Sequence, residues 1–363
     1  MALTAAFTFF LTISGFGSKE HYKDAKKYVE IERVIEENYI GDADTSSMYD
    51  AAASTMVKSL GDKWSYYMTA EEYAAYKLSS ANEYAGIGVG VRVNDDGDFE
   101  IVSVDPGTPA ETAGLKEGET IVSIDGESVK GKTLSDVQTM IRSKLNKNFK
   151  MVVTDEDGDD VTVTVECEVI YKNPVSSKML SGNIGYIKIR NFEAGCSENT
   201  IKAIEELISE GAVSFIFDVR DNPGGLVSEL VDLLDYLLPK GDLFVSVDKE
   251  GNETVKTSDK VCLKYKMAVL VNAKSYSAAE FFAAALQEYN WATIVGEQTT
   301  GKARSQITIE LSDGGAVHIS TNKYLTPNRV DLADAGGVRP DITAVNTEKD
   351  SEVQLNAAIK ALS

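Results

Sequence analysis

Three units in the second half of the chain each place an apolar strand before an amphipathic helix, and this alternation constrains the fold more than any other feature. The units read IGYIKIRNF then ENTIKAIEELISEG, VSFIFDVR then LVSELVDLLDYLL, and MAVLVNA then AAEFFAAALQEY. Alternating strands and helices are typical of α/β architecture. The segments Val213–Phe217 and Met267–Val271 are almost continuously apolar, which predicts a sheet that helices cover on both faces.

Between Gly86 and about Ile170 the sequence changes to short strands of alternating polarity. The segments GIGVGVRV, FEIVSV, ETIVSIDG, KMVVTDEDG and VTVTVECEVI are separated by turns containing glycine and aspartate. Alternation of period two between such turns predicts β-strands. Two helices interrupt the strands, a short one around Pro109 to Gly114 and a longer one at TLSDVQTMIRSKL. We therefore expect a second compact domain here.

The N-terminal part combines two patterns. Residues Ala2 to Phe16 are apolar and uncharged, and several lysines follow them. This run is shorter than the ~20 residues that a spanning helix needs, so it is interpreted as a truncated membrane anchor or signal segment. A buried helix of a soluble protein is the alternative. From about Tyr22 to Ser80 the apolar spacing is helical, which predicts a small helical region suited to a dimer contact or a stalk.

Charge and residue counts exclude several function classes. The formal net charge of -21 argues against nucleic acid and anionic lipid headgroups as partners, because both are negatively charged. Cys167, Cys196 and Cys262 lie far apart without a CxxC spacing, so they predict no zinc site and no disulfide framework, although one disulfide remains open. A Ser-His-Asp enzyme would have to use one of two histidines, and His318 is the more plausible.

Two strand–helix junctions carry candidate chemistry. In DVRDNPGGLVSEL, Gly224 and Gly225 leave their backbone N–H groups open at a helix N-terminus, where an oxyanion can be stabilised. In NAKSYSAAEFFAAALQEY, Ser277 is a candidate nucleophile, and the N–H of Ala278 can face the same carbonyl. Each junction also has a simpler interpretation. The first can be a turn without a ligand, and Ser275 or Ser277 can be a helix cap.

A serine nucleophile needs a proton acceptor, and Lys302 in VGEQTTGKARSQ is the candidate. An ordinary lysine has a pKa of about 10.4 and is protonated near pH 7. Burial against apolar strands lowers the pKa of a lysine by several units, which would make a neutral amine available as the base. The simpler interpretation is a solvent-exposed lysine in a loop.

Four separated motifs together resemble the C-terminal processing proteases, also called tail-specific peptidases, of peptidase family S41. They are DVRDNPGG, the run SYSAAE, a GK pair whose Lys302 lies 25 residues after Ser277, and Gln306 four residues beyond. The resemblance continues through LGDKWSYYM and KYLTPNRVDLADAGGVRPDI, and the module from Gly86 to Ile170 resembles a PDZ domain. It covers nearly everything after the N-terminal apolar run.

The resemblance implies a Ser-Lys dyad of Ser277 and Lys302, with Gln306 orienting the lysine. Gly225 or Gly224 and Ala278 would line the oxyanion hole. The implied fold is a multi-domain α+β protein. It combines a β-sandwich-like PDZ domain with two helices, a crotonase/ClpP-like α/β catalytic core and an N-terminal helical region. No metal and no cofactor are implied.

The PDZ resemblance also assigns residues that bind substrate. The backbone amides of the GIGV segment would receive the terminal carboxylate while the peptide adds as a strand; these residues are Gly86, Ile87, Gly88 and Val89. Arg142 in the PDZ helix is the candidate for coupling peptide docking to catalysis. The sequence departs from the family pattern in the GKARSQ loop, in Tyr276 and in Ala279, where members commonly carry GKGxVQ, alanine and serine.

The sequence therefore predicts a serine endopeptidase that cleaves unfolded or C-terminally exposed polypeptides. We expect it to be extracytoplasmic, anchored to the membrane only through its N-terminal segment, with a possible homodimer contact in the helical region. The alternatives are a catalytically impaired PDZ scaffold, an acyl-thioester enzyme and a serine–histidine enzyme using His318. The predicted divisions are an anchor or signal segment (1–17), the helical region (18–81), the PDZ domain (82–170), the protease core (171–350) and a C-terminal helix (351–363).

Overall fold

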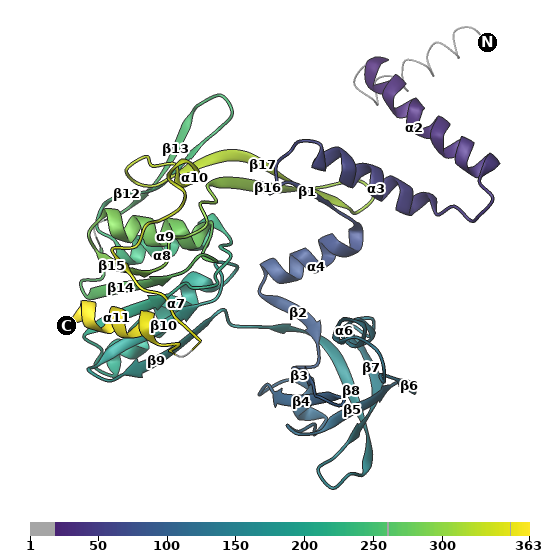
Figure 1. Ribbon diagram of the computed structural model, residues 1–363, viewed down its shortest axis with the longest axis horizontal. Helices are drawn as coiled ribbons and strands as arrows, with labels where there is room; N and C mark the ends of the chain where they lie inside the picture. Colours follow the sequence, from purple (N-terminus) through teal and green to yellow (C-terminus); the bar gives the residue numbers. More distant parts are fainter. Residues whose placement is uncertain (1–18, 260, 349) are drawn as a thin grey trace. The chain divides into compact units, whose positions relative to one another are not determined.

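The computed structural model describes residues 19–259, 261–348 and 350–363 (Figure 1). Backbone contacts divide the chain into two units. The first contains the described residues up to Thr69 together with Ile309–His318, and the second contains Ala70–Thr308 and Ile319–Ser363. The domain boundaries predicted from the sequence stay predictions.

The first unit is mainly helical, as the periodicity predicted. Its elements are α2 (Lys19–Asn38), α3 (Thr45–Lys58) and the short strand β1 (Tyr66–Met68). Asp44 begins α3 as an N-cap, because its carboxylate accepts the N–H groups of Ser46 and Ser47. Strand β1 pairs antiparallel with the start of β17 (Ala316–Leu325), where Tyr66 faces His318 and the two rings stack 4.7 Å apart.

The second unit contains the predicted domain of short strands. Its seven-stranded sheet has the order β2-β8-β7-β5-β4-β3, with β6 beside β5. One helix precedes its strands and two lie among them, and the capping box of Thr133 and Asp136 begins the last of the three, α6. The elements are α4 (Ala70–Ser80), β2 (Glu83–Gly86), β3 (Val89–Val93), β4 (Phe99–Val104), α5 (Pro109–Thr112), β5 (Thr120–Ile124), β6 (Glu127–Ser128), α6 (Leu134–Arg142), β7 (Lys147–Thr154) and β8 (Asp160–Tyr171).

The strand–helix units form a six-stranded sheet of order β18-β15-β14-β11-β10-β9. All neighbouring strands are parallel except β9, which runs antiparallel beside β10. The elements are β9 (Val175–Leu180), β10 (Ile184–Ile189), α7 (Cys196–Ser209), β11 (Ser214–Asp218), α8 (Val227–Leu237), β14 (Lys266–Val271), α9 (Ala278–Glu288), β15 (Ala292–Gly296), β18 (Ile342–Thr343) and α11 (Val353–Leu362).

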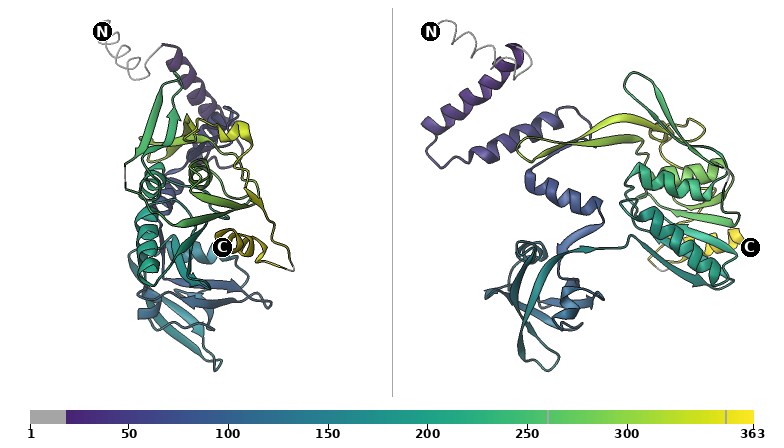
Figure 2. Two further views of the ribbon diagram at one scale, coloured as in Figure 1. Left: turned by 90° about the vertical axis from the view of Figure 1, so that its left-hand side faces the viewer. Right: turned by 180° about the vertical axis from the view of Figure 1, so that it is seen from behind.

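Helices cover this sheet on both faces, as the apolar strands predicted. Phe215 and Phe217 of β11 belong to the core that also contains residues of α7, α8 and α9. Ile216 between them faces the opposite way, into a smaller core with Ala358 and Leu362 of α11. Figure 1 shows α11 in front of the sheet, and the right view of Figure 2 shows the face that α7 and α8 cover. The fold class predicted from the sequence is confirmed.

A third sheet of order β1-β17-β12-β13, with β16 paired to β17, completes the strands. Its remaining elements are β12 (Gly241–Val247), β13 (Glu253–Ser258) and β16 (Arg304–Glu310), and the short helix α10 (Leu332–Ala335) follows β17. No helix in the described part of the chain is long and apolar enough to cross a membrane. The predicted anchor or signal segment at 1–17 lies outside the described residues.

Candidate active site

The candidate residues follow three neighbouring parallel strands of the six-stranded sheet. The glycine turn follows β11, Ser277 follows β14, and Lys302 follows β15, with β14 lying between the other two. Parallel strands present their carboxyl ends at one edge, where ligands bind in α/β sheets. Segments that are distant in sequence are therefore brought to one place.

Ser277 is the N-cap of α9 and has an unusual backbone. Its φ and ψ are 58° and -127°, a region that costs free energy for a residue with a side chain. Its N–H donates to Oε2 of Glu280 at 2.9 Å, and its carbonyl accepts from the N–H of Glu280 and Phe281. The residue is 9% exposed. A sharp strand-to-helix turn thus presents the hydroxyl from a rigid position.

The glycine turn lies directly against Ser277. A Cβ at Gly224 would stand 2.7 Å from Cβ of Ser277 and 2.9 Å from N of Ala278, and a Cβ at Gly225 would stand 2.3 Å from the carbonyl carbon of Phe192. Both glycines have positive φ, 92° and 149° respectively. Only glycine satisfies this turn, because the backbone conformation and the close approach both exclude a side chain.

Asn222 decides which N–H groups of the turn are available. Its Oδ1 accepts from Gly224 N at 2.8 Å, its amide donates to the carbonyl of Ile189 at 2.9 Å, and its own carbonyl accepts from Tyr276 N at 3.1 Å. The N–H of Gly224 is therefore occupied. Within the described residues, the N–H groups of Gly225 and Ala278 have no protein acceptor, so they remain the donors that can face an oxyanion. Sequence reasoning did not identify Asn222.

Lys302 is half-buried in the loop between β15 and β16. Its backbone N donates to Oε2 of Glu280 at 2.8 Å, the same oxygen that accepts from Ser277 N. Its ammonium nitrogen lies 5.9 Å from the centre of the Tyr276 ring, at the outer limit of a cation–π contact. One carboxylate oxygen thus joins the segments of both predicted dyad members.

Gln306 lies on β16, where its amide nitrogen donates to the carbonyl of Arg304 and to Oγ of Ser320, each at 3.0 Å. The Arg304 side chain forms an ion pair with Asp331 at 3.2 Å and donates to the carbonyl of Ala303. The unusual GKARSQ loop is therefore fixed by its own arginine.

Glu193 is another residue near the glycine turn that sequence reasoning did not identify. It directly follows Phe192, which forms a bridge with Gly225. Burial and, to a smaller extent, the carboxylate of Glu229 raise the pKa of Glu193, and the charge of Lys302 opposes them, so that the pKa lies at about 7. Its Oε2 is buried and has no hydrogen-bond partner among the described residues. No pattern in the sequence marks this position.

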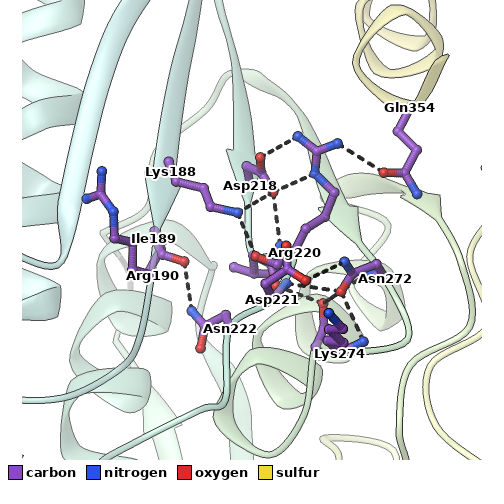
Figure 3. A network of polar contacts seen from close by, with 12 residues as sticks. Lys188, Ile189, Arg190, Asp218, Arg220, Asp221, Asn222, Asn272, Lys274 and Gln354 are labelled. Carbon is purple, nitrogen blue, oxygen red and sulfur yellow. Dashed lines mark hydrogen bonds and ion pairs between the residues drawn. The ribbon is translucent and has the colours of Figure 1, made fainter. Parts of the chain in front are cut away.

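A network of side-chain ion pairs and hydrogen bonds stabilises the start of the glycine turn (Figure 3). Asp218 is 1% exposed and pairs with Arg220 at 2.6 Å and with Lys188 at 3.2 Å. Burial raises the pKa of Asp218, but the hydrogen bond and charge of Arg220 and the charge of Lys188 outweigh it, so the pKa lies below its usual value. Arg220 also donates to Oε1 of Gln354 on α11 at 3.0 Å, as Figure 3 shows.

The predicted carboxylate-binding segment lines a groove in the PDZ-like domain. Gly86 to Val89 run from the end of β2 to the start of β3, and the cavity that they line together with residues of α6 measures about 110 Å³. Its apolar wall includes Val137 and Ile141, and Arg142 lies at the same groove. Gly88 has φ of 86°, and a Cβ there would stand 2.3 Å from Thr108 Cβ, so this segment also requires glycine.

Comparisons with known proteins agree with these observations. The family model described as peptidase family S41 matches residues 183–344, and a PDZ domain model matches residues 100–155. The carboxy-terminal processing protease CtpA of Bacillus subtilis (strain 168) is 31% identical over 349 residues, which cover 94% of this chain and 74% of that protein. A probable CtpA-like serine protease of Staphylococcus aureus (strain COL) is 30% identical, covering 93% of this chain and 68% of that protein.

Solved structures are similar over most of the chain. The photosystem II D1 C-terminal processing protease has a TM-score of 0.53 at 25% identity, covering 96% of this chain and 92% of that one. A putative S41 protease from Bacteroides fragilis has a TM-score of 0.56 at 19% identity, covering 89% and 92%, and supports the fold alone. The resemblance inferred from the motifs is confirmed. The chain belongs to peptidase family S41, as a serine-type C-terminal processing protease with a PDZ domain.

Proposed function

We propose that this protease cleaves polypeptides with a Ser-Lys dyad of Ser277 and Lys302. The observation that carries the proposal is the shared hydrogen-bond acceptor Oε2 of Glu280, which holds the backbone N–H of both residues. The glycine turn is packed against the same serine. These contacts support an active site at the edge of one sheet, with Ser277 as nucleophile, Lys302 as base and the turn as the source of oxyanion donors.

The reaction follows from these positions. Oγ of Ser277 attacks the peptide carbonyl carbon while Nζ of Lys302 takes the hydroxyl proton. The N–H groups of Gly225 and Ala278 stabilise the oxyanion, because within the described residues neither has a protein acceptor. The C–N bond then breaks, the lysine returns the proton to the leaving amine, and an acyl-enzyme forms. Water activated by the neutral lysine attacks the ester and releases the second product.

Lys302 has to lose its proton before it can act as a base. In the free enzyme the Lys302 ammonium lies 5.9 Å from the centre of the Tyr276 ring, and its charge lowers the pKa of Glu193. We propose that a bound peptide excludes water from the half-buried loop and so favours the neutral amine, because desolvation disfavours the charged form. The amide oxygen of Gln306 is proposed to orient the lysine, since the amide nitrogen is already engaged by Arg304 and Ser320.

Substrate capture is assigned to the PDZ groove. We propose that the N–H groups around Gly86 to Val89 bind the terminal carboxylate and that the peptide adds beside β3 as a strand. Val137 and Ile141 in the groove favour an apolar side chain at the C-terminus. Arg142 at the same groove is the proposed link between peptide docking and catalysis.

We also propose where the enzyme is located in the cell and how it assembles. An extracytoplasmic enzyme tethered by residues 1–17 would meet exposed C-termini at the cell envelope. The α2 helix exposes several apolar side chains, which supports a homodimer contact; they are Tyr28, Val29, Ile31 and Val34. Light scattering of the protein and of Ile31→Glu tests this contact, and an unchanged mass in the variant would contradict it.

The dyad and the capture step are tested together with the full chain. Cleavage of an unfolded protein and of peptides with free or amidated C-termini is measured for wild type, Ser277→Ala and Lys302→Ala. We expect both variants to be inactive and amidated peptides to be cleaved more slowly. Residual activity of either variant near the wild-type rate would remove that residue from the dyad. Equal rates for both peptide forms would remove carboxylate capture.

A further inference from the structure

Glu280 is the fully buried acid in the first turn of α9, with an exposed fraction of 0%. Four donors surround its two carboxylate oxygens. Oε2 accepts from Ser277 N at 2.9 Å and Lys302 N at 2.8 Å, and Oε1 accepts from Gly301 N at 2.6 Å and Thr299 Oγ1 at 2.5 Å. A buried acid is retained only with such compensation, because an unpaired charge in the interior is strongly destabilising.

The position of this carboxylate differs from that of an ordinary capping residue. The acid of a capping box accepts the N–H of its own N-cap, and here that N-cap is Ser277. The same oxygen also accepts from a loop that follows the next strand, at Lys302. Thr300 adds hydrogen bonds to the carbonyls of Ser275 and Ala273, and these contacts fix the loop without involving Ser277 or Lys302.

We propose that Glu280 is a positioning residue that sets the separation of Ser277 and Lys302 through their backbone N–H groups. This inference rests on the proposed dyad. Hydrogen bonds to an ionised acceptor are short and directional, so the carboxylate fixes the N–H of Ser277 and the loop of Lys302 relative to one another. A displacement of about 1 Å in such a site lowers the rate by about a hundredfold.

The substitutions Glu280→Gln and Glu280→Ala differ in how many of the four hydrogen bonds to this side chain they keep. An amide has one acceptor oxygen and one donor nitrogen. In Glu280→Gln the amide nitrogen can face Thr299, whose hydroxyl oxygen can accept, while the amide oxygen keeps both N–H groups of Ser277 and Lys302. Gly301 N then loses its acceptor. In Glu280→Ala all four donors lose their partner, and the connection between the two segments is removed.

A matched control is available in Thr299, whose hydroxyl donates to Oε1 and not to Oε2, the oxygen that accepts from Ser277 N and Lys302 N. Its hydroxyl also accepts from Val338 N at 2.7 Å, so Thr299→Val removes two hydrogen bonds in the same buried network. The experiment uses the full chain with an unfolded protein substrate and a chromogenic peptide with a free C-terminus. Thermal unfolding, kcat, KM and the pH dependence of kcat are measured for wild type, Glu280→Gln, Glu280→Ala, Thr299→Val and Ser277→Ala.

We expect Glu280→Ala to lose about a hundredfold or more in kcat with KM within about threefold, and its pH dependence to change because the amine moves relative to the hydroxyl. Glu280→Gln should recover at least tenfold of that loss. Thr299→Val should lower the unfolding temperature while its kcat stays within about threefold of wild type.

Two results would overturn the positioning role. One is a kcat for Glu280→Ala within about threefold of wild type, and the other is an equal loss of kcat in folded Thr299→Val, which would indicate general destabilisation. Activity in Ser277→Ala would instead refute the proposed dyad itself, so the two failures are distinguishable.

Discussion

Replacing Glu193 by glutamine should stabilise the catalytic core at alkaline pH and have little effect at acid pH. The carboxyl has a pKa of about 7 in the folded protein against 4.5 as its ordinary value, chiefly because of burial and then because of Glu229, with Lys302 opposing. Between these two values the folded protein binds more protons than the unfolded chain, so stability falls as the pH rises through this range. Below it the carboxyl is neutral in both states.

The size of the effect follows from the shift. At about 1.4 kcal/mol for each pKa unit, a rise from 4.5 to about 7 corresponds to about 3 kcal/mol. The side chain is only half-buried, so solvent screening reduces this value, and we expect about 2 kcal/mol. Glutamine keeps the shape but has no charge to bury. The difference in unfolding free energy between Glu193→Gln and wild type should therefore grow by about 2 kcal/mol between about pH 5 and pH 8.

Urea unfolding followed by tryptophan fluorescence measures this difference. Trp291 packs against the main core and donates to the carbonyl of Leu263 at 3.1 Å, so it reports on the sheet that carries the site. Trp64, the other tryptophan, is replaced by phenylalanine in every sample. Glu198→Gln, at an exposed position on α7, controls for the loss of one negative charge. A stability difference that is independent of pH would refute the reasoning.

Three further substitutions test other parts of the site. Gly224→Ala should lower the unfolding temperature and should lower kcat at least tenfold, since the new Cβ would stand 2.7 Å from that of Ser277 at a φ of 92°. An unchanged kcat would contradict the close packing of the glycine turn against Ser277. Asp218→Asn should destabilise the core by about 3–5 kcal/mol near pH 7, because Lys188 and Arg220 lose a buried partner. The low pKa of Asp218 means that its contribution disappears as the pH falls through the folded pKa, so the two proteins should converge in acid urea titrations. Gly88→Ala should abolish binding of a peptide with a free C-terminus, measured by calorimetry, while a short ester substrate is still cleaved; wild-type affinity would refute the assignment of the groove.

Local periodicity and turn chemistry in the sequence predicted the elements of the core correctly. The apolar strands predicted before amphipathic helices correspond to β10, β11 and β14 of the structure. The prediction of a sheet covered on both faces is confirmed. The motifs also placed Ser277 at a strand–helix junction and Lys302 after the next strand. Both features are local, because the spacing of apolar residues and the glycines of a turn determine a segment without reference to the rest of the chain.

The tertiary structure alone decided how these segments act on one another. Oε2 of Glu280 accepts from Ser277 at one strand–helix junction and from Lys302 in the loop after the next strand. Oδ1 of Asn222 accepts the N–H of Gly224 in the neighbouring glycine turn. The sequence analysis did not identify Glu280, because its contacts with the loop of Lys302 depend on the folded sheet. Arg220 reaches Gln354 on the last helix, a pair separated by 134 residues. Periodicity carries no information about such pairs, because a side chain finds its partner across strands only after the sheet has fixed where each strand ends.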